Sequence, residues 1–365
     1  MTTHVPHPDL PPPSTSIGAI AWLRANLFSS WLNSLLTLGA AYLLYLTIPP
    51  LVQWALIDAD WFGDSREACE SGGACWVFVG VRMNQFMYGL YPETEYWRIN
   101  LAAILLVLLM VPLFIKRFPW KRWLVPFVLF GYPVIAFMLF SGGVFGLEYV
   151  ETSRWGGLTL TLILSSVGMA ASLPLGILLA LGRRSDMPIV KSVSVVIIEF
   201  WRGVPLITVL FMSSVMLPLF LPEGTHFDKL LRAMIGIALF QSAYMAEVVR
   251  SGLQAIPKGQ YEAAQALGLS YWQSMGLIIL PQALKLVIPG IVNTFIALFK
   301  DTTLVLIIGL FDMLAMIQAA LADPNWLGYA IEGLSFAALV YWVFCFSMSR
   351  YSLSLERKLH TGHTR

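Results

Sequence analysis

Ionisable side chains inside apolar segments are the residues of this sequence best placed to do chemistry. Five of them lie in or beside long apolar runs: Glu199, Arg202, Glu247, Lys300 and Asp301. A charge in apolar surroundings is costly, so such residues by default mark a polar path or an ion pair. Arg202 follows Glu199 by three residues, and Arg250 follows Glu247 by the same helical spacing. We interpret both acids as members of local ion pairs, with substrate contact, shared with Tyr244, as the alternative.

The pair Lys300-Asp301 lies deeper in its apolar segment and is followed by Thr302 and Thr303. A zwitterionic ligand needs an acid for its ammonium group and hydrogen-bond donors for its carboxylate. This cluster offers both, so it is a candidate for contact with a substrate. A local pairing of Lys300 with Asp301 is the alternative.

Several kinds of active site are excluded by what the sequence lacks. All five histidines lie in the two tails or in a polar loop, so a buried histidine-based metal or nucleophile site is not expected. The nucleotide-binding motif G-x-x-x-x-G-K-[ST] is absent. A net charge of +2 is too small to indicate nucleic acid as a partner. We expect no catalytic residue, and no cofactor or metal bound by this chain.

Two of the three cysteines lie close together. Cys69 and Cys75 flank five residues of a long polar loop. If that loop faces an oxidising compartment, the two thiols are suited to form a disulfide. Two free thiols are the alternative, and a metal site lacks a third ligand nearby.

Membrane helices must position these residues. The chain is 58% hydrophobic and only 12% charged, about half of the roughly 25% charged residues typical of soluble domains. A bilayer core takes roughly 20 helical residues, and eight apolar stretches approach that length. They are Ser30–Leu56, Ile99–Ile115, Trp123–Phe140, Leu158–Leu181, Val204–Leu221, Ala233–Val249, a stretch from about Leu284, and Leu334–Met348. We therefore expect an all-α integral membrane protein with about eight transmembrane helices.

Basic residues predict the orientation. Lysine and arginine gather at 116–122 and 183–191, after Val249 and in the C-terminal tail, whereas the loop 57–98 holds seven acids against three arginines. The loop should therefore face outward and both termini the cytoplasm. The predicted organisation is a tail at 1–29, three helices at 30–150 with the cysteine loop 57–98, a second block at 151–359 with a cytoplasmic loop 250–282, and a tail at 360–365.

The stretch 284–321 is ambiguous by length. Two full spans there would place the basic tail outside, so we expect one crossing followed by a partly inserted or interfacial segment. Lys300-Asp301 marks where regular helix should give way, because irregular backbone at membrane depth is tolerated only against protein or water.

Local signals in the loop 250–282 predict a helix, a turn and a second helix. Pro257 suits the first turn of a helix, and Gly268 suits a left-handed cap at its end. Ser270 and Gln273 have the spacing of a capping box that begins the next helix. The alanines 263, 264 and 266 should present a surface with little side-chain bulk, where another protein can approach closely.

The same loop fits the pattern E-A-A-x3-G-x9-I-x-L-P at every fixed position: Glu262, Ala263, Ala264, Gly268, Ile278, Leu280 and Pro281. This pattern resembles the signature cytoplasmic loop of the membrane subunits of binding-protein-dependent ABC importers. The resemblance implies that the loop docks into a dimer of separate ATP-binding subunits, which would hold the ATP and Mg. The absence of a nucleotide-binding motif from this chain agrees with ATP being bound by separate subunits.

Three other blocks narrow the resemblance. Residues 199–206 are similar to the E-x-x-R-G-T-P-L segment of polar amino-acid permeases, with Val204 where threonine is usual. Residues 242–252 and 300–304 resemble two further blocks, and the extra N-terminal spans resemble the long M-type permease of the general L-amino-acid uptake system. The resemblance implies a type I importer core of five helices in a bacterial inner membrane. It also implies a homologous second permease, a periplasmic amino-acid-binding protein and surrounding lipid as partners.

Two other classes of protein remain as alternatives. An ion-coupled secondary amino-acid transporter tends to show two similar halves with matching broken helices, and the sequence shows no such halves. A membrane-embedded enzyme would need a catalytic cluster at the interface, and the histidine positions argue against one.

Overall fold

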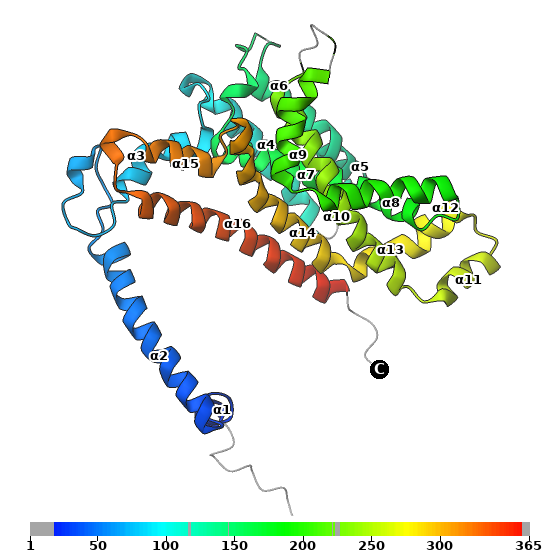
Figure 1. Ribbon diagram of the computed structural model, residues 1–365, viewed down its shortest axis with the longest axis horizontal. Coiled ribbons are helices and arrows are strands. Elements are labelled where there is room, and N and C mark those ends of the chain that lie inside the picture. The colour runs from blue at the N-terminus through cyan, green and yellow to red at the C-terminus, as the bar shows by residue number, and fades with distance from the viewer. Residues whose placement is uncertain (1–17, 116–117, 145, 221, 223–226, 360–365) are drawn as a thin grey trace, which may run out of the picture. The chain divides into compact units, whose positions relative to one another are not determined.

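The computed structural model describes residues 18–115, 118–144, 146–220, 222 and 227–359, and Figure 1 shows their helices. Every regular element in these ranges is helical, and extended pairing is limited to isolated bridges. This confirms the predicted all-α membrane fold. The predicted C-terminal tail 360–365, most of the predicted N-terminal tail and all five histidines lie outside the described residues.

The chain divides into two compact units at Val77. The first unit contains α1 (Ala19–Asn26) and α2 (Trp31–Val52), which continues through a π-helical turn at Gln53–Ile57. The helix Trp31–Ile57 is apolar all round and none of it is buried, as expected for a helix that faces lipid. The predicted group 30–150 is therefore split between the two units.

The cysteine loop lies in the first unit and contains a 3-10 turn, Arg66–Ala68. The structure joins Cys69 to Cys75 in a disulfide. A short bridge pairs Asp60 with Cys75, and the Asp60 carboxylate accepts hydrogen bonds from the Ser71 amide and hydroxyl at 3.1 and 2.8 Å. These contacts fold the acidic loop back on itself.

The second unit begins at Phe78, the second residue of α3 (Val77–Tyr88). A 3-10 turn at Glu93–Glu95 and α4 (Tyr96–Phe114) follow. A span from Lys121 to Ser141 follows, made of α5 (Lys121–Pro126), a π turn (Phe127–Gly131) and α6 (Tyr132–Ser141). A 3-10 turn at Thr152–Arg154 then leads into α7 (Gly157–Arg183).

The chain bends sharply by 102° between α8 (Pro188–Gly203) and the helical run Leu206–Phe220. That run comprises α9 (Leu206–Phe211), a π turn (Met212–Met216) and a 3-10 turn (Leu217–Phe220). Val204 is extended, with φ −107° and ψ 132°, because a residue before proline is disfavoured in helix. The Gly-Val-Pro sequence thus breaks the helix, and the predicted span Val204–Leu221 is preceded by a separate helix.

The long helix α10 (Lys229–Ala255) follows, capped by Asp228, whose side chain accepts a hydrogen bond from the Leu231 amide. After the loop described below come α14 (Ile288–Asp301), a 3-10 helix (Thr302–Ile308), α15 (Met313–Leu321), a 3-10 turn (Pro324–Trp326) and α16 (Ala330–Leu359). The α-helix gives way at Asp301 as predicted. With nine residues, α15 is only about 14 Å long and too short to cross a bilayer.

Within the described residues, six helices are long and apolar enough to span a membrane, or seven if the bent pair counts as one span. The predicted total of eight requires α10 as well. That helix is less apolar, and about half of its residues are buried inside the unit. A central helix shielded from lipid can carry more polar residues, so the count of eight stays a prediction.

Small residues bring the central helices close together. A Cβ added at Gly176 of α7 would lie 2.7 Å from the Met245 side chain of α10, and one added at Gly168 would lie 2.8 Å from the Leu298 side chain of α14. Close backbone approach at glycine is the usual basis of helix packing in membranes. A hydrogen bond from the Gln241 side chain to the Thr294 carbonyl, at 2.7 Å, also joins α10 to α14.

Candidate functional site

The loop after α10 is a helix–turn–helix, as its local signals predict. Pro257 stands directly before α11 (Lys258–Ala266). Gly268 adopts the left-handed conformation with φ 72°. Its amide donates to the Gln265 carbonyl at 2.9 Å, and the Leu269 amide donates to the Ala264 carbonyl at 3.2 Å. These two bonds form a Schellman motif, which ends α11 and reverses the chain.

The second helix of the loop begins at α12 (Tyr271–Ser274), where the Gln273 side chain accepts a hydrogen bond from the Ser270 amide at 3.0 Å. The predicted capping box is therefore confirmed. The helix continues through a π turn at Met275–Ile279 into α13 (Leu280–Leu286).

One face of the loop is built into the core at the C-terminal ends of α7 and α10. Ile279 is fully buried in a cluster that includes Leu181 of α7 and Val249 of α10. Ala264 is also fully buried. The Tyr261 hydroxyl donates to the Leu253 carbonyl at 3.1 Å. Motion of the loop must therefore move the two long helices.

The structure corrects the predicted alanine surface. Ala263 and Ala266 are exposed, but Ala264 is fully buried, because its methyl group faces the chain's own core. Among the other motif residues, Glu262, Gly268 and Pro281 are exposed, whereas Ile278 and Leu280 are partly buried against the core cluster.

Large apolar side chains on the outer face of the loop were not anticipated. Leu267 is 74% exposed, Trp272 is 68% exposed and Leu277 is 72% exposed. Exposed apolar groups beside a signature motif are a candidate contact surface for another protein. Tyr271 lies beside them, and burial raises the pKa of its hydroxyl, against a lowering effect of the Arg184 charge. This phenol therefore stays neutral at physiological pH.

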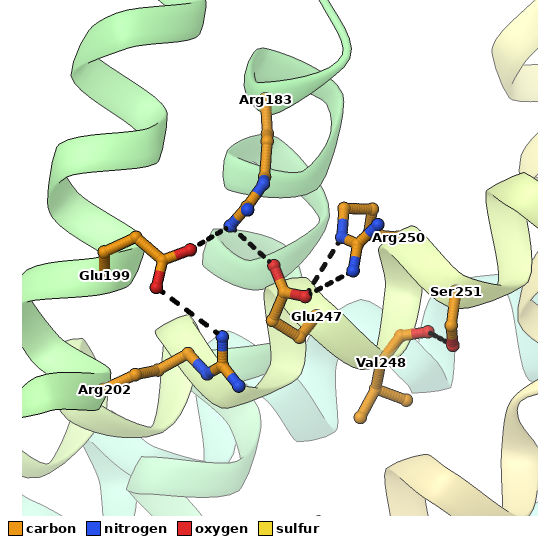
Figure 2. A network of polar contacts seen from close by, with 7 residues as sticks. All are labelled: Arg183, Glu199, Arg202, Glu247, Val248, Arg250 and Ser251. Atoms are coloured by element: carbon orange, nitrogen blue, oxygen red, sulfur yellow. Dashed lines mark hydrogen bonds and ion pairs between the residues drawn. The ribbon is translucent and has the colours of Figure 1, made fainter.

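A network of five charged side chains joins α7, α8 and α10 near their ends (Figure 2). One nitrogen of Arg183, Nη1, lies 2.8 Å from a carboxylate oxygen of Glu199 and 2.8 Å from one of Glu247. Arg250 contacts Glu247 at 2.7 Å, and Arg202 lies 3.9 Å from Glu199. Both predicted local pairs are present, and Arg183 links them.

Tyr244 contacts the network, because the Arg202 guanidinium lies 5.9 Å from the centre of its ring. Arg184, next to Arg183, lies 5.5 Å from the ring of Tyr261 in the loop 250–282, which is called the coupling loop below. The role of Arg183 was missed from the sequence. It stands 16 residues from Glu199 and 64 from Glu247, and no local spacing reveals such a contact.

The cluster at 300–303 is arranged differently from its prediction. Within the described residues, Lys300 and Asp301 form no ion pair with each other or with another residue. The Thr302 hydroxyl donates to the Phe299 carbonyl at 2.8 Å, and the Thr303 hydroxyl donates to the Lys300 carbonyl at 3.0 Å. The alternative of a Lys300–Asp301 ion pair is therefore wrong, and both hydroxyls donate to the backbone. Contact of this cluster with a substrate stays a prediction.

A buried polar centre next to this cluster was also missed. Asp312 is fully buried and accepts hydrogen bonds from the Tyr341 hydroxyl at 2.9 Å and the Ala315 amide at 3.0 Å. The Met313 amide donates to the Thr161 hydroxyl at 3.2 Å. The centre fixes the start of α15 to α7 and α16. No group of three or more metal-ligating side chains occurs in the part of the chain that the structure covers.

Comparisons with known proteins identify the family to which this chain belongs. Residues 172–361 match the family described as "Binding-protein-dependent transport system inner membrane component". The inner membrane amino-acid ABC transporter permease protein YhdY of Escherichia coli (strain K12) is 61% identical over 359 residues, with 98% of each chain covered. The glutamate/glutamine/aspartate/asparagine transport system permease protein BztC of Rhodobacter capsulatus is 42% identical, covering 97% of this chain and 96% of that protein.

Among solved structures, the crystal structure of an amino acid ABC transporter with histidines matches 55% of this chain and 92% of its own, with 29% identity and a TM-score of 0.49. The family match spans more than half of the chain and includes the whole helix–turn–helix loop. This chain therefore belongs to the family of inner membrane components of binding-protein-dependent transport systems.

Proposed function

We propose that this chain is one of two different permease subunits in an ATP-driven importer of L-amino acids. Its partners are a homologous permease, a dimer of ATP-binding subunits that holds ATP and Mg, and a periplasmic amino-acid-binding protein. The chain itself binds no cofactor. It lies in the bacterial inner membrane among lipids, with both termini in the cytoplasm.

The observation that carries the proposal is the construction of the coupling loop. Its outer face exposes Leu267, Trp272 and Leu277, while the buried Met275 and Ile279 anchor its inner face to the core around α7 and α10. A surface of this kind binds one partner and passes that partner's movement into the membrane helices.

The charge network gives the same helices a second connection. Arg183 holds Glu199 of α8 and Glu247 of α10 at 2.8 Å each. A displacement of the loop therefore moves α7, α8 and α10 as one block, which is the movement needed to open and close a pore between two permease subunits. We assign this network to coupling, and substrate contact by Glu199, Arg202, Tyr244 or Glu247 stays the alternative.

The substrate class rests on the relatives. BztC is named for transport of glutamate, glutamine, aspartate and asparagine, and YhdY is named for amino acids without further distinction. We infer that uptake extends to L-amino acids of several charge classes.

Uptake by the reconstituted complex tests the proposal. With binding protein outside the vesicles and ATP inside, labelled leucine, glutamate and arginine should each accumulate and compete with one another. Vanadate should stop uptake, whereas collapse of the proton and sodium gradients should leave it unchanged. Uptake that survives vanadate and stops without an ion gradient would identify a secondary transporter instead.

A further inference from the structure

A cavity lies at the ends of the helices opposite the charge network. Its volume is about 510 Å³, and its charged and polar lining includes Glu151, Thr152, Asp228, Lys229 and Arg232. These residues precede α7 or begin α10, whereas the network joins the other ends of the same two helices. On α10, Arg232 and Glu247 stand 15 residues apart, which places them about 22 Å apart along the helix. In the proposed orientation the cavity opens on the periplasmic side.

The charges around this cavity are only partly used by the protein. Each oxygen of the Asp228 carboxylate already accepts one hydrogen bond, from the Leu231 amide at 3.0 Å and from the Thr152 hydroxyl at 2.5 Å. Within the described residues, Glu151 and Lys229 take part in no ion pair. The cavity therefore keeps one acid and one base available to a ligand.

Arg232 provides the second cation. Its Nη1 donates a hydrogen bond to the Ser214 carbonyl, which fixes the guanidinium against the π turn after α9. Its Nε is buried and has no hydrogen-bond partner. The Arg232 side chain also lines the cavity, where its remaining Nη donors can reach an anion.

We propose that this cavity is an outer binding site for the zwitterionic head group of a free L-amino acid. The ligand carboxylate is held by Lys229 and Arg232, and the ligand ammonium group by Glu151. The inference rests on the proposed function and adds where the substrate first meets this chain after it leaves the binding protein.

Chemistry and size both fit this ligand. Guanidinium and ammonium groups bind carboxylates through charge-assisted hydrogen bonds, and a carboxylate accepts the donors of an ammonium group. The volume lies within the roughly 300–1,000 Å³ of small-molecule sites, which leaves room for side chains of several sizes. Recognition of the head group alone would accept every L-amino acid, in keeping with broad uptake.

Photo-crosslinking in the working complex tests the site. Photo-leucine, which carries a diazirine on its side chain, is supplied with binding protein to the reconstituted importer and activated during turnover. Mass spectrometry should place adducts in the peptides containing 151–153 and 227–232. Excess leucine, glutamate and arginine should each suppress these adducts, whereas isoamylamine, which lacks the carboxylate, should not.

Two variants and a control test whether Lys229 and Arg232 hold the ligand carboxylate. Lys229→Gln and Arg232→Gln should each lower the adduct yield about tenfold, the ratio expected for losing one hydrogen bond between charged groups. Arg154→Gln removes an exposed positive charge two residues from Thr152 but outside the cavity lining, and it should leave the yield unchanged. Lys229 is exposed, so its variant avoids the folding risk at Arg232.

Adducts absent from both peptides, or a yield unchanged in Lys229→Gln, would overturn the outer site. A third result would also overturn it: the ligand-free binding protein associates more weakly with the Lys229→Gln complex while the adduct yield is unchanged. Lys229 would then contribute to docking of the binding protein and not to binding of the amino acid. Uptake of labelled leucine by the unmodified complex is measured in parallel. Active uptake without adducts rejects only this site, whereas absent uptake rejects the proposed function.

Discussion

Arg183 is the residue on which the charge network depends. It contacts two carboxylates from two helices through the same nitrogen. Its side chain is 24% exposed and that of Glu247 is 18% exposed, so solvent screens these contacts only in part. Without Arg183, each acid would keep only the ion pair on its own helix. The link from α8 to α10 would then be limited to the Arg202–Tyr244 contact and to weaker charge interactions at longer range.

Replacing Arg183 tests whether this link matters for coupling. We expect Arg183→Gln to lower ATP-driven uptake about tenfold, as the loss of a charge-assisted link between moving helices would do, with the complex still assembled. Arg183→Lys should retain most of the activity, because both contacts use one nitrogen and an ammonium group has three donors. Uptake and ATPase rates measured on the same vesicles provide the check.

Lys191→Gln is the matched control, because Lys191 is an exposed base of α8 outside the network. Equal uptake by Arg183→Gln and Lys191→Gln would show that the network plays no part in coupling.

At the scale of elements, the coupling loop depends on its turn. Gly268 has φ 72° and nothing within 4 Å of an added Cβ, so a substitution there meets a conformational cost and no clash. That cost is about 1–2 kcal/mol for an ordinary residue in the left-handed region and is smaller for asparagine, which tolerates it. The turn fixes the angle at which α11 meets α12, and hence the shape of the docking face.

Gly268→Val should therefore impair both ATP-driven uptake and co-purification of the ATP-binding subunit, since a β-branched residue resists the left-handed conformation. Gly268→Asn, with a side chain of similar size, should keep both. Tandem purification followed by uptake in vesicles measures the two properties. If valine behaved like asparagine at this position, the loop would not be the docking element.

Elements with local signals could be predicted from the sequence. The cap at Gly268, the capping box at Ser270 and the end of α14 at Asp301 each follow from one or a few neighbouring residues. Contacts between distant segments could not. The burial of Ala264 depends on how α11 packs against the core, and the links of Arg183 depend on how α7, α8 and α10 meet.

At the scale of the whole molecule, α7 and α10 connect two kinds of site. They run in the same direction, with the proposed outer site at their first residues and the charge network near their last. Their close contact at Gly176 favours movement as a pair. A displacement of the coupling loop can thus be transmitted along these two helices to the opposite membrane face.

The single coupling loop also bears on how the importer is assembled. In the proposed importer, this chain supplies one docking element, whereas a dimer of ATP-binding subunits would offer two equivalent clefts. Many apolar side chains of its spans are exposed, including Leu162, Leu175 and Leu178 of α7. Surfaces of this kind in a membrane subunit face lipid or a second subunit. A homologous permease would supply both the second loop and the other wall of the pore.

Native mass spectrometry of the complex purified through a tag on this chain tests that composition. We expect one copy of this chain, one copy of a different homologous permease and two ATP-binding subunits. A second purification through a differently tagged copy of the same chain should recover none of the first tag, because each pore would hold only one. Two copies of this chain without the homologue would reject the heterodimer. That result would leave the assignment to the importer family intact, since the assignment rests on the coupling loop and on the family match over residues 172–361.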